Sequence, residues 1–448
     1  MQRLITSIIG ILFFSSAILF AQSAPDTAKT GKIKTGWTFG AVPAVTYNSD
    51  LGFQYGAVVN LFYFGDGKTY PKYLHNIYLE WSRYTKGSGI NMLRYDSEHL
   101  IPGVRLTGEL SYLTEQALDF YGFNGLEATF NPNFSDTKST DYISRMFYRM
   151  NRNVFKVKAE FQGSIIGKKL RWLAGVEFSN VKADTVDVAK LNKGKTKDLL
   201  PYTPTLFQKY VDWGIISSKE KNGGTNTLLK FGLIYDTRDN EPNPMKGIWT
   251  ELELLAAPSF LGNGDFPYTR LILTHRQYFT LAPNVLSFAY RLSYQGKLGG
   301  TMPYYMLPYA YNSAPDFTRD GFGGSKTIRG VIRDRVVGDG VAFGNLEFRW
   351  KFVRTVLWNQ NLYLALSAFT DGGMVTNDTK IDLTTAKLDP EYSKFFPSGI
   401  NKDGLHLGYG GGFHLGLNEN FVVACDVAFA AKKDDGKMGL YIGIGWLF

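Results

Sequence analysis

The sequence predicts an all-β chain: a transmembrane antiparallel β-barrel of about sixteen strands with a long loop folded into its lumen. Three observations predict this class. Apolar and polar residues alternate through many segments after Trp37, the connections between those segments alternate between short and long, and the chain begins with an export signal. After that signal no apolar run reaches the roughly 20 residues that a spanning helix needs. An exported chain of this kind can cross a membrane only as a closed barrel.

The amino terminus has the composition of a secretory signal peptide, which we place at residues 1–21. Arg3 supplies the positive charge, residues 4–20 form an uncharged apolar run, and small residues follow at Ala21, Ser23 and Ala24. Cleavage is expected near Ala21 or Ser23, and a retained membrane anchor is the alternative reading. Residues 22–35 form a short polar periplasmic lead that is too small to fold alone. Residues 36–448 form the predicted barrel, without an internal domain boundary.

The composition is compatible with a barrel and argues against several other classes. Hydrophobic residues are 44% of the chain and the mean hydropathy is -0.15, because a polar face dilutes an apolar one in alternating strands. Aromatic residues reach 15% and glycine numbers 48, which suits strands, interface belts and turns. The net charge of +9 is spread among acids and bases without a basic block, so nucleic-acid binding is not expected. Cys425 is the only cysteine, which excludes an internal disulfide and a thiolate metal cluster.

Sixteen segments alternate with the period of a strand, whose successive side chains point to opposite faces. The clearest is 285–298, and a soluble sandwich, which also alternates, would show turn signals more often than these long segments do. The predicted strands are 37–47, 51–64, 73–85, 88–99, 103–115, 143–165, 169–183, 225–236, 248–257, 267–280, 285–298, 341–353, 361–375, 403–416, 419–431 and 437–448.

The connections predict which rim faces which compartment. Four links are tight, at 100–102, 166–168, 281–284 and 417–420, and four are long, at 116–142, 184–224, 299–340 and 376–402. Outer-membrane barrels place their short turns in the periplasm and their long loops outside. An even number of strands then leaves both termini on the periplasmic side.

The stretch 321–352 joins a Gly-rich loop to the most regular strand. Leu346, Phe348 and Trp350 share one face, and Glu347 and Arg349 share the other, so one face is apolar and the other charged. We expect the loop to fold back and bring its single arginine, Arg329, against the charged face of the strands that follow.

The last segment alternates Leu440, Ile442, Ile444, Trp446 and Phe448, and the chain ends on the aromatic residue. A final strand that ends in an exposed aromatic resembles the sorting signal of bacterial outer-membrane proteins. The alternative is an ordinary soluble edge strand, which would be an aggregation hazard if uncovered.

Four motifs in order resemble the barrels of the BamA/TamA family of outer-membrane insertases, the bacterial surface antigen family, over residues 36–448. The motifs are Tyr235-Asp-Thr-Arg-Asp-Asn followed by Pro244 and Gly247, then Gly323-Gly-Ser-Lys-Thr-Ile-Arg-Gly, Gly344-Asn-Leu-Glu-Phe-Arg and Phe369-Thr-Asp-Gly-Gly-Met-Val. The resemblance implies a turn motif of Asp236, Arg238, Asp239, Pro244 and Gly247, and a lumen loop motif of Gly323, Gly324, Ile328, Arg329 and Gly330.

The resemblance also implies that Arg329 pairs with Glu347 and Asp371 in the lumen. Parity agrees, because Glu347 and Asp371 both lie opposite the aliphatic faces of two neighbouring predicted strands. A guanidinium has five donors in a planar fork and can bridge two carboxylates. The alternative is an arginine solvated in a mobile loop.

The sequence departs from the family pattern in two places, and the family properties tied to those places are not expected in this chain. Only residues 22–35 precede the barrel where the family has periplasmic POTRA domains, so this chain is expected to be a POTRA-less variant without POTRA-mediated partners. The residue after the loop's Arg-Gly is Val331 rather than an aromatic.

The family resemblance implies that the first and last strands close the barrel weakly. Pro43 in the first segment cannot donate a ladder hydrogen bond, and Gly439, Gly443 and Gly445 leave the last strand few side chains to pack. The alternative is that these residues only shape a barrel corner.

No other chemistry is indicated. The Gly-rich loop lacks the Gly-Lys-Ser/Thr ending of a phosphate loop, and the acids around Arg238 do not have EF-hand spacing. His406 and His414 lie about 27 Å apart along one strand, so they cannot share a metal. We expect no catalytic site, no metal and no cofactor.

The expected function is therefore that of an integral barrel in the outer membrane of a Gram-negative bacterium, contacting outer-membrane lipid and assisting the insertion or translocation of unfolded outer-membrane protein clients. The alternative is a passive pore, an anchor or a platform for surface loops, which the long segments 184–224 and 376–402 would suit.

Overall fold

The computed structural model describes residues 34–48, 51–69, 73–128, 130–167, 169–241, 243–314, 321–357, 360–396, 403–417 and 421–448. The predicted signal peptide at 1–21 and most of the polar lead lie outside the described residues.

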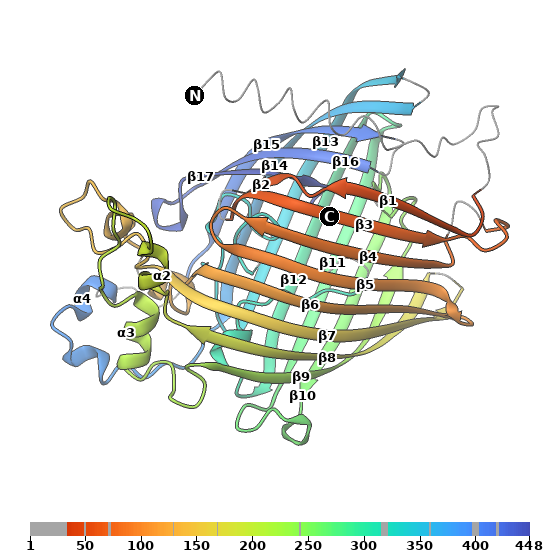
Figure 1. Ribbon diagram of the computed structural model, residues 1–448. Coiled ribbons are helices and arrows are strands. Elements are labelled where there is room, and N and C mark those ends of the chain that lie inside the picture. The colour runs from red at the N-terminus through yellow and green to blue at the C-terminus, as the bar shows by residue number, and fades with distance from the viewer. Residues whose placement is uncertain are drawn as a thin grey trace.

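The wall is a single antiparallel sheet that closes on itself (Figure 1). Both β1 and β2 pair with β3, so they are two halves of one wall strand, and the seventeen segments make sixteen barrel strands. The strands are β1 (Trp37–Pro43), β2 (Thr46–Asn48), β3 (Gly52–Tyr63), β4 (His75–Tyr84), β5 (Ser88–Ile101), β6 (Val104–Asp119), β7 (Arg149–Ile166), β8 (Leu170–Asp184), β9 (Gly223–Asp236), β10 (Gly247–Ala257), β11 (Tyr268–Ala282), β12 (Leu286–Gly300), β13 (Gly340–Leu357), β14 (Gln360–Asn377), β15 (His406–Leu417), β16 (Phe421–Ala430) and β17 (Met438–Ile444).

The predicted fold class is confirmed, but several predicted strand bounds are wrong: the segments 103–115 and 341–353 run on to Asp119 and Leu357, and the segment 403–416 begins only at His406. The segment 143–165 begins only at Arg149, because Phe147 and Tyr148 are drawn into the packed core of the loops. The segment 37–47 is interrupted after Pro43, where the chain leaves the ladder for two residues. The segment 437–448 ends at Ile444.

The two faces of the wall differ as the alternation predicts. In β13 the side chain of Phe348 is 51% exposed on the outer face, whereas Glu347 beside it is fully buried in the interior. The outer face of the other strands is likewise rich in exposed aliphatic and aromatic residues. Such a face is stable against hydrocarbon, and the charged interior is stable because its groups pair with one another.

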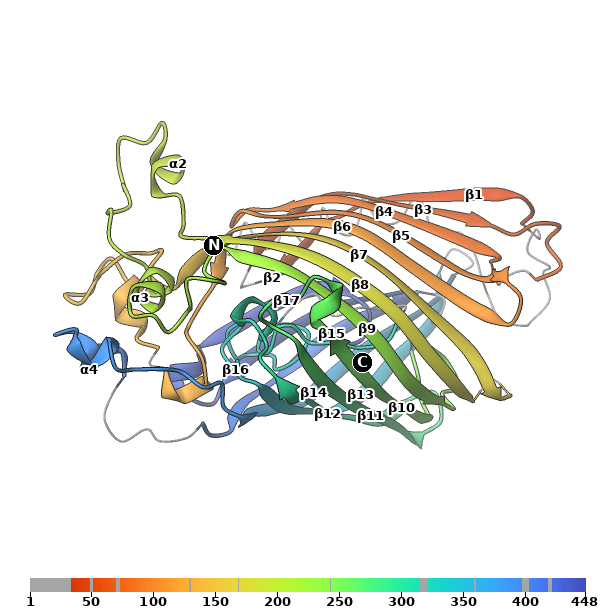
Figure 2. The same cartoon turned by 90° about the horizontal axis from the view of Figure 1, so that it is seen from below.

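The long connections gather at one end of the barrel, which we call the loop end, and the tight turns at the other, the turn end (Figures 1 and 2). None of the helices in the described part of the chain is long and apolar enough to cross a membrane. The short helices are α2 (Val188–Asn192), α3 (Leu206–Asp212), α4 (Tyr392–Phe395), η1 (Gly125–Glu127), η2 (Pro132–Ser135), η3 (Ser259–Leu261), η4 (Tyr304–Met306), η5 (Ala386–Leu388) and η6 (Lys433–Asp435).

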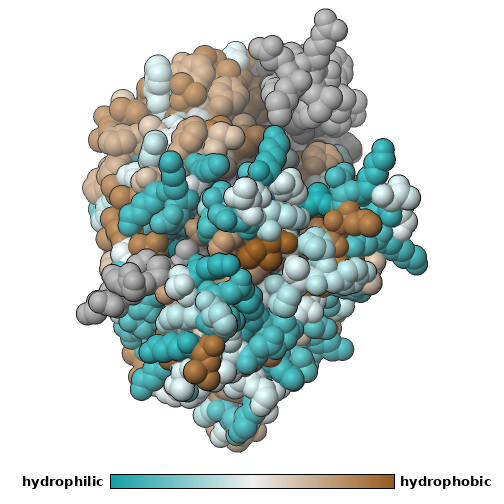
Figure 3. Space-filling view, turned by 90° about the vertical axis from the view of Figure 1, so that its left-hand side faces the viewer, coloured by the Kyte–Doolittle hydropathy of each residue, from teal (hydrophilic) through white to brown (hydrophobic). Residues whose placement is uncertain are grey.

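An aromatic core holds the loops together. Phe147, Tyr210 and Trp213 are buried with residues of the β12–β13 and β14–β15 connections, including Tyr304 and Phe395. The loop end is thus a packed structure whose outer surface is mostly hydrophilic (Figure 3).

The outer face predicts a depth-dependent cost of charge. Phe348→Arg, in the middle of β13, should lower the free energy of unfolding in lipid vesicles by about 2–4 kcal/mol. Val285→Arg, in a tight turn at the turn end, should cost only about 0–1 kcal/mol. Urea unfolding of both variants measures the difference, and equal costs would contradict a lipid-facing Phe348.

Candidate functional site

The connection between β12 and β13 turns back into the barrel, and the second of its two described parts, residues 321–339, is almost entirely buried. Gly323, Gly324 and Gly330 have φ angles of 96°, 83° and 92°, in the left-handed region that glycine adopts at little cost. Ile328 is fully buried in a small apolar cluster with Val331. The loop motif therefore lies in the lumen, and valine fills the position where the family has an aromatic.

Side chains of the loop and the wall fix the loop backbone. The Thr327 hydroxyl donates to the carbonyl oxygens of Gly321 and Gly323, each at 3.0 Å. Asn345 of β13 donates its amide to the Thr327 carbonyl oxygen at 2.7 Å. The loop is thus hydrogen-bonded internally and to the wall before its arginine is considered.

Arg329 lies against both predicted acids. Its Nε and Nη2 donate to the two carboxylate oxygens of Asp371 at 2.8 and 3.2 Å, and its backbone N–H donates to the same carboxylate at 3.0 Å. Its Nη2 also lies 2.9 Å from Oε2 of Glu347. The guanidinium is 1% exposed, so these interactions operate with little screening by water.

Two further partners were not predicted from the sequence. Nη1 of Arg329 donates to Asp426 of β16 at 3.0 Å, and the guanidinium carbon lies 3.4 Å from the ring centre of Phe369. Phe369 is two residues from Asp371 in β14 and so faces the same way, which its motif could have indicated. Asp426 was detectable as the acid that shares a face with Val422, Ala424 and Ala428 in an otherwise apolar strand.

Glu347 links this cluster to the end of the chain. Its second oxygen accepts a hydrogen bond from Nε of Arg349 at 2.7 Å, and Nη2 of Arg349 donates to the carbonyl oxygen of Phe448 at 2.8 Å. One carboxylate therefore serves two cations, one on the lumen loop and one that holds the carboxyl-terminal residue.

The prediction that Trp446 and Phe448 extend the last strand as exposed aromatics is wrong. Gly445 has a φ of 87°, which ends the strand and turns the chain into the lumen. Trp446 stacks on His414 of β15 with ring centres 3.9 Å apart, and both terminal aromatics are less than a tenth exposed. Phe448 packs on Tyr278 of β11. Burial of two large aromatic side chains opposes their extension along the wall.

The barrel closes through a short seam between β17 and β2. Among the described residues, Tyr441 pairs with Asn48 and Ile442 with Tyr47, whereas the other neighbouring strand pairs contain more such pairs. β1 pairs with β3 on one side, and no described strand pairs with it on the other. Pro43 is the last residue of β1, and the space beside Gly443 is open. Trp37 and Phe39 of this strand are strongly exposed.

The turn motif lies at the turn end, between β9 and β10, apart from the cluster around Arg329. Asp236 accepts two hydrogen bonds from the Arg238 guanidinium at 3.0 and 2.9 Å, and Asp239 accepts from the backbone N–H of Met245 at 3.0 Å. Gly247 has a φ of 107° directly after the turn, and Pro244 is buried within it. These contacts stabilise a turn.

The two lumen histidines are far apart and have different partners. His406 lies between Asp403 and Asp435, with nitrogen–oxygen distances of 2.9 and 2.6 Å. His414 lies 3.5 Å from Asp426 and stacks on Trp446.

The contacts of Arg329 predict an order of importance among its acids. Asp371→Asn should lower the free energy of unfolding by about 3–5 kcal/mol, because the buried cation loses a bidentate partner. Asp426→Asn removes one contact and should cost about 1–3 kcal/mol. Urea unfolding in lipid vesicles checks this order. Asp434→Asn, at an exposed position, is the control, and equal losses at 371 and 426 would contradict it.

Close packing of the loop on the wall predicts a strict need for glycine at 408. A Cβ added to Gly408 of β15 would collide with the carbonyl oxygen of Arg329. Gly408→Ala should therefore displace the loop and lower stability by about 1–3 kcal/mol. Gly108→Ala is the matched control, because its nearest atom, the carbonyl oxygen of Lys158, is 3.9 Å away. Limited proteolysis of the loop and urea unfolding measure both effects, and indistinguishable variants would argue against loop seating at this glycine.

The chain was compared with protein families, curated proteins and solved structures. Residues 85–448 match the Omp85 superfamily domain. No curated protein matches the sequence. The fold is similar to that of BamA from Haemophilus ducreyi lacking POTRA domains 1-3, at a TM-score of 0.55 and 15% identity, over 98% of this chain and 78% of that one.

It is also similar to CdiB from Escherichia coli, at a TM-score of 0.53 and 9% identity, over 91% of this chain and 62% of that one. At these identities the two structures support the fold alone. The domain match covers most of the chain, and the chain belongs to the Omp85 superfamily as an outer-membrane β-barrel of the BamA type.

Proposed function

We propose that this barrel assists the insertion or translocation of outer-membrane protein clients through its seam, without covalent chemistry. The observation that carries the proposal is the seam itself: two residue pairs close the barrel beside the edge of β1, which has a partner on one side only among the described residues. We also propose that residues 1–21 direct export of the chain and are then removed by cleavage.

A strand edge of this kind is a template for another strand. Unpaired backbone N–H and C=O groups bind an extended segment by adding it to the sheet. β1 offers the edge of Trp37–Pro43, and its exposed Trp37 and Phe39 lie on the outer side of the wall. An unfolded client strand that pairs there would be held at the boundary between the barrel and the lipid.

The carboxyl-terminal residues are the second part of the proposed gate. Trp446 and Phe448 lie in the lumen, so they do not pair with β1. Gly445, with a φ of 87°, lies where the chain bends after β17, and neither Gly443 nor Gly445 has a neighbouring atom within 4 Å of an added Cβ. The proposed gate requires the end of the chain to move between the lumen and the seam by a change at Gly445.

The buried lumen loop argues against the passive pore. The loop lies across the interior from β13 to β16, and its residues 321–339 are held by charge and apolar contacts. The proposed activity uses the wall rather than the lumen as the path for clients.

Locking the seam should abolish activity. Tyr47→Cys and Ile442→Cys are paired across the seam, and the background is Cys425→Ser because Cys425 lies opposite Ile442 on the neighbouring strand. Oxidation should reduce insertion of an unfolded eight-stranded client barrel into liposomes to the rate of empty liposomes, and reduction should restore it.

Leu366→Cys with Phe413→Cys is the matched control, since it cross-links β14 to β15 through equally exposed outer positions. It should leave insertion unchanged. Full activity of the quantitatively cross-linked seam variant would refute the gating proposal, as would steady large single-channel currents without client insertion.

A further inference from the structure

A cavity of about 400 Å³ opens at the loop end, outside the lumen cluster and away from the seam pairs. Its walls come from the β6–β7 connection, from the tip between β16 and β17, and from Ile332 of the lumen loop. Pockets that bind small molecules have volumes of roughly 300–1,000 Å³. The cavity is larger than a single phosphate ion needs and large enough for a sugar ring.

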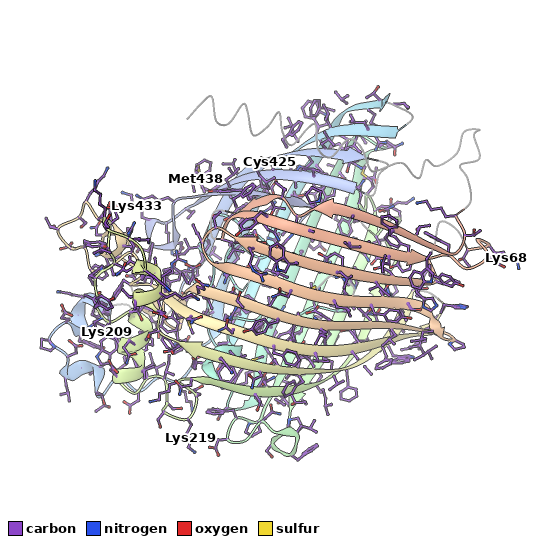
Figure 4. All side chains as sticks on the ribbon, in the orientation of Figure 1. Lys68, Lys209, Lys219, Cys425, Lys433 and Met438 are labelled. Carbon is purple, nitrogen blue, oxygen red and sulfur yellow. The ribbon has the colours of Figure 1, made fainter. Side chains whose placement is uncertain are left out.

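The lining is strongly cationic. Arg145, Lys433 and Lys437 line the cavity, and among the described residues none of the three forms an ion pair with a carboxylate; the Arg145 guanidinium donates to the carbonyl oxygen of Asp198 at 2.8 Å. Arg149 also lines it but is paired with Asp119. Asp136 is the one carboxylate among the described lining residues. Lys433 lies at the loop end (Figure 4), where the surface is mostly hydrophilic (Figure 3). The cavity is therefore suited to an anionic ligand.

Three aromatic rings contribute an apolar wall. The ring centre of Tyr121 lies 5.1 Å from that of Phe130 and 5.3 Å from that of Tyr148. The Phe130 and Tyr148 centres are 5.2 Å apart, and the Tyr148 hydroxyl accepts a hydrogen bond from the backbone N–H of Asn131 at 2.9 Å. The rings are thus held in place by one another and by the backbone. Tyr121 and Tyr148 are 5% and 3% exposed and support Phe130, whose partly exposed ring is the one that can pack against the C–H groups of a sugar.

The β16–β17 tip, which carries Lys433 and Lys437, is held in place by buried residues of the loop end. Asp435, between Lys433 and Lys437, is fully buried, and its carboxylate lies 2.6 Å from Nδ1 of His406. Its backbone carbonyl accepts from the N–H of Ile332 at 2.8 Å. His406 is held in turn by Asp403, whose carboxylate accepts from the backbone N–H of Leu126 at 2.8 Å.

Asp403 and His406, which hold the tip, carry opposite charges. Burial alone would raise the pKa of Asp403, but the hydrogen bond and charge of His406 lower it below the ordinary value. Both ring nitrogens of His406 face carboxylate oxygens, an arrangement that favours the imidazolium, which has two donors. A wall ordered before a ligand arrives binds more tightly, because less freedom is lost on binding.

We propose that this cavity binds an anionic sugar, in which a phosphate pairs with Lys433, Lys437 and Arg145 while the sugar ring packs on the aromatic wall. Charge-assisted hydrogen bonds from lysine and arginine hold the phosphate, and Asn133, Ser135 and Asp136 can contact sugar hydroxyls at the rim. Such a group occurs in the phosphorylated head groups of outer-leaflet glycolipids and in soluble sugar phosphates.

The test uses the full barrel in detergent micelles and four probes: glucose 6-phosphate, glucose, inorganic phosphate and lipopolysaccharide, the last either intact or dephosphorylated. Titration calorimetry should detect binding of glucose 6-phosphate or of intact lipopolysaccharide. Glucose and dephosphorylated lipopolysaccharide should not bind, and inorganic phosphate should bind more weakly than the phosphorylated sugar. Binding of intact lipopolysaccharide alone assigns the glycolipid as the source, and binding of both assigns the sugar phosphate itself.

The paired variant Lys433→Ala/Lys437→Ala should weaken binding by about tenfold or more, because it removes two charged donors. Lys433→Arg/Lys437→Arg should retain binding. Lys193→Ala/Lys195→Ala, which removes the same charge from exposed positions on another loop at the same end, should have no effect.

Failure of both phosphorylated probes to bind would overturn the proposal. So would binding that the paired alanine variant leaves unchanged, and so would inorganic phosphate that binds as tightly as the sugar phosphate. The proposal does not rest on the seam, and the paired alanine variant should insert clients at the normal rate.

Discussion

The structure depends on one neutralised charge in the lumen. A guanidinium that is 1% exposed would be costly without partners, and Arg329 has three carboxylates from three strands, β13, β14 and β16. Because each strand supplies one acid, the loop can be seated only when the wall from β13 to β16 is formed. The loop and the wall therefore stabilise one another. Glycines remove the steric obstacle, since Gly408 leaves space for the carbonyl oxygen of Arg329.

The shared carboxylate of Glu347 extends this dependence to the seam. One of its oxygens lies in an ion pair with Arg329, the other accepts a hydrogen bond from Arg349, and Arg349 donates to the main-chain oxygen of Phe448. A displacement of the lumen loop would change the charge balance at Glu347 and so the position of Arg349. The end of the chain is in this way connected to a loop that is about 120 residues away in sequence, by one ion pair and two hydrogen bonds.

The parts of this site that were predictable are those set by local periodicity. The alternation around Glu347 and Asp371 placed both acids on the lumen face, and the family resemblance placed Arg329 opposite them. Asp426 was not predicted, because its role depends on which strands become neighbours, although its parity was available. The inward turn after Gly445 was not predictable from alternation, because Trp446 and Phe448 continue the strand pattern. The lumen position is favoured by contacts with His414 and Tyr278, which come from other strands. The packed loop end likewise depends on contacts between distant connections.

In the proposed gate the end of the chain would lie either in the lumen, as observed, or extended along the seam, and the seam register bears on the free-energy difference between these two positions. Continuing the pairing of Ile442 with Tyr47 would place Trp446 opposite Pro43, which has no N–H to donate. Extension would thus add only a few ladder hydrogen bonds, each with a net value of about 0.5–1.5 kcal/mol. The lumen position instead buries two aromatic side chains, each with a value of about 1.5–3 kcal/mol. The two totals are of the same order, so under the proposed function a modest change at either end would suffice to move the chain terminus. A client strand on β1, or a shift of Arg349, would be such a change. We infer that Pro43 and Gly445 act together in the proposed gate. Pro43 limits the number of hydrogen bonds that an extended last strand could form at the seam, and Gly445 permits the turn that takes the chain end into the lumen.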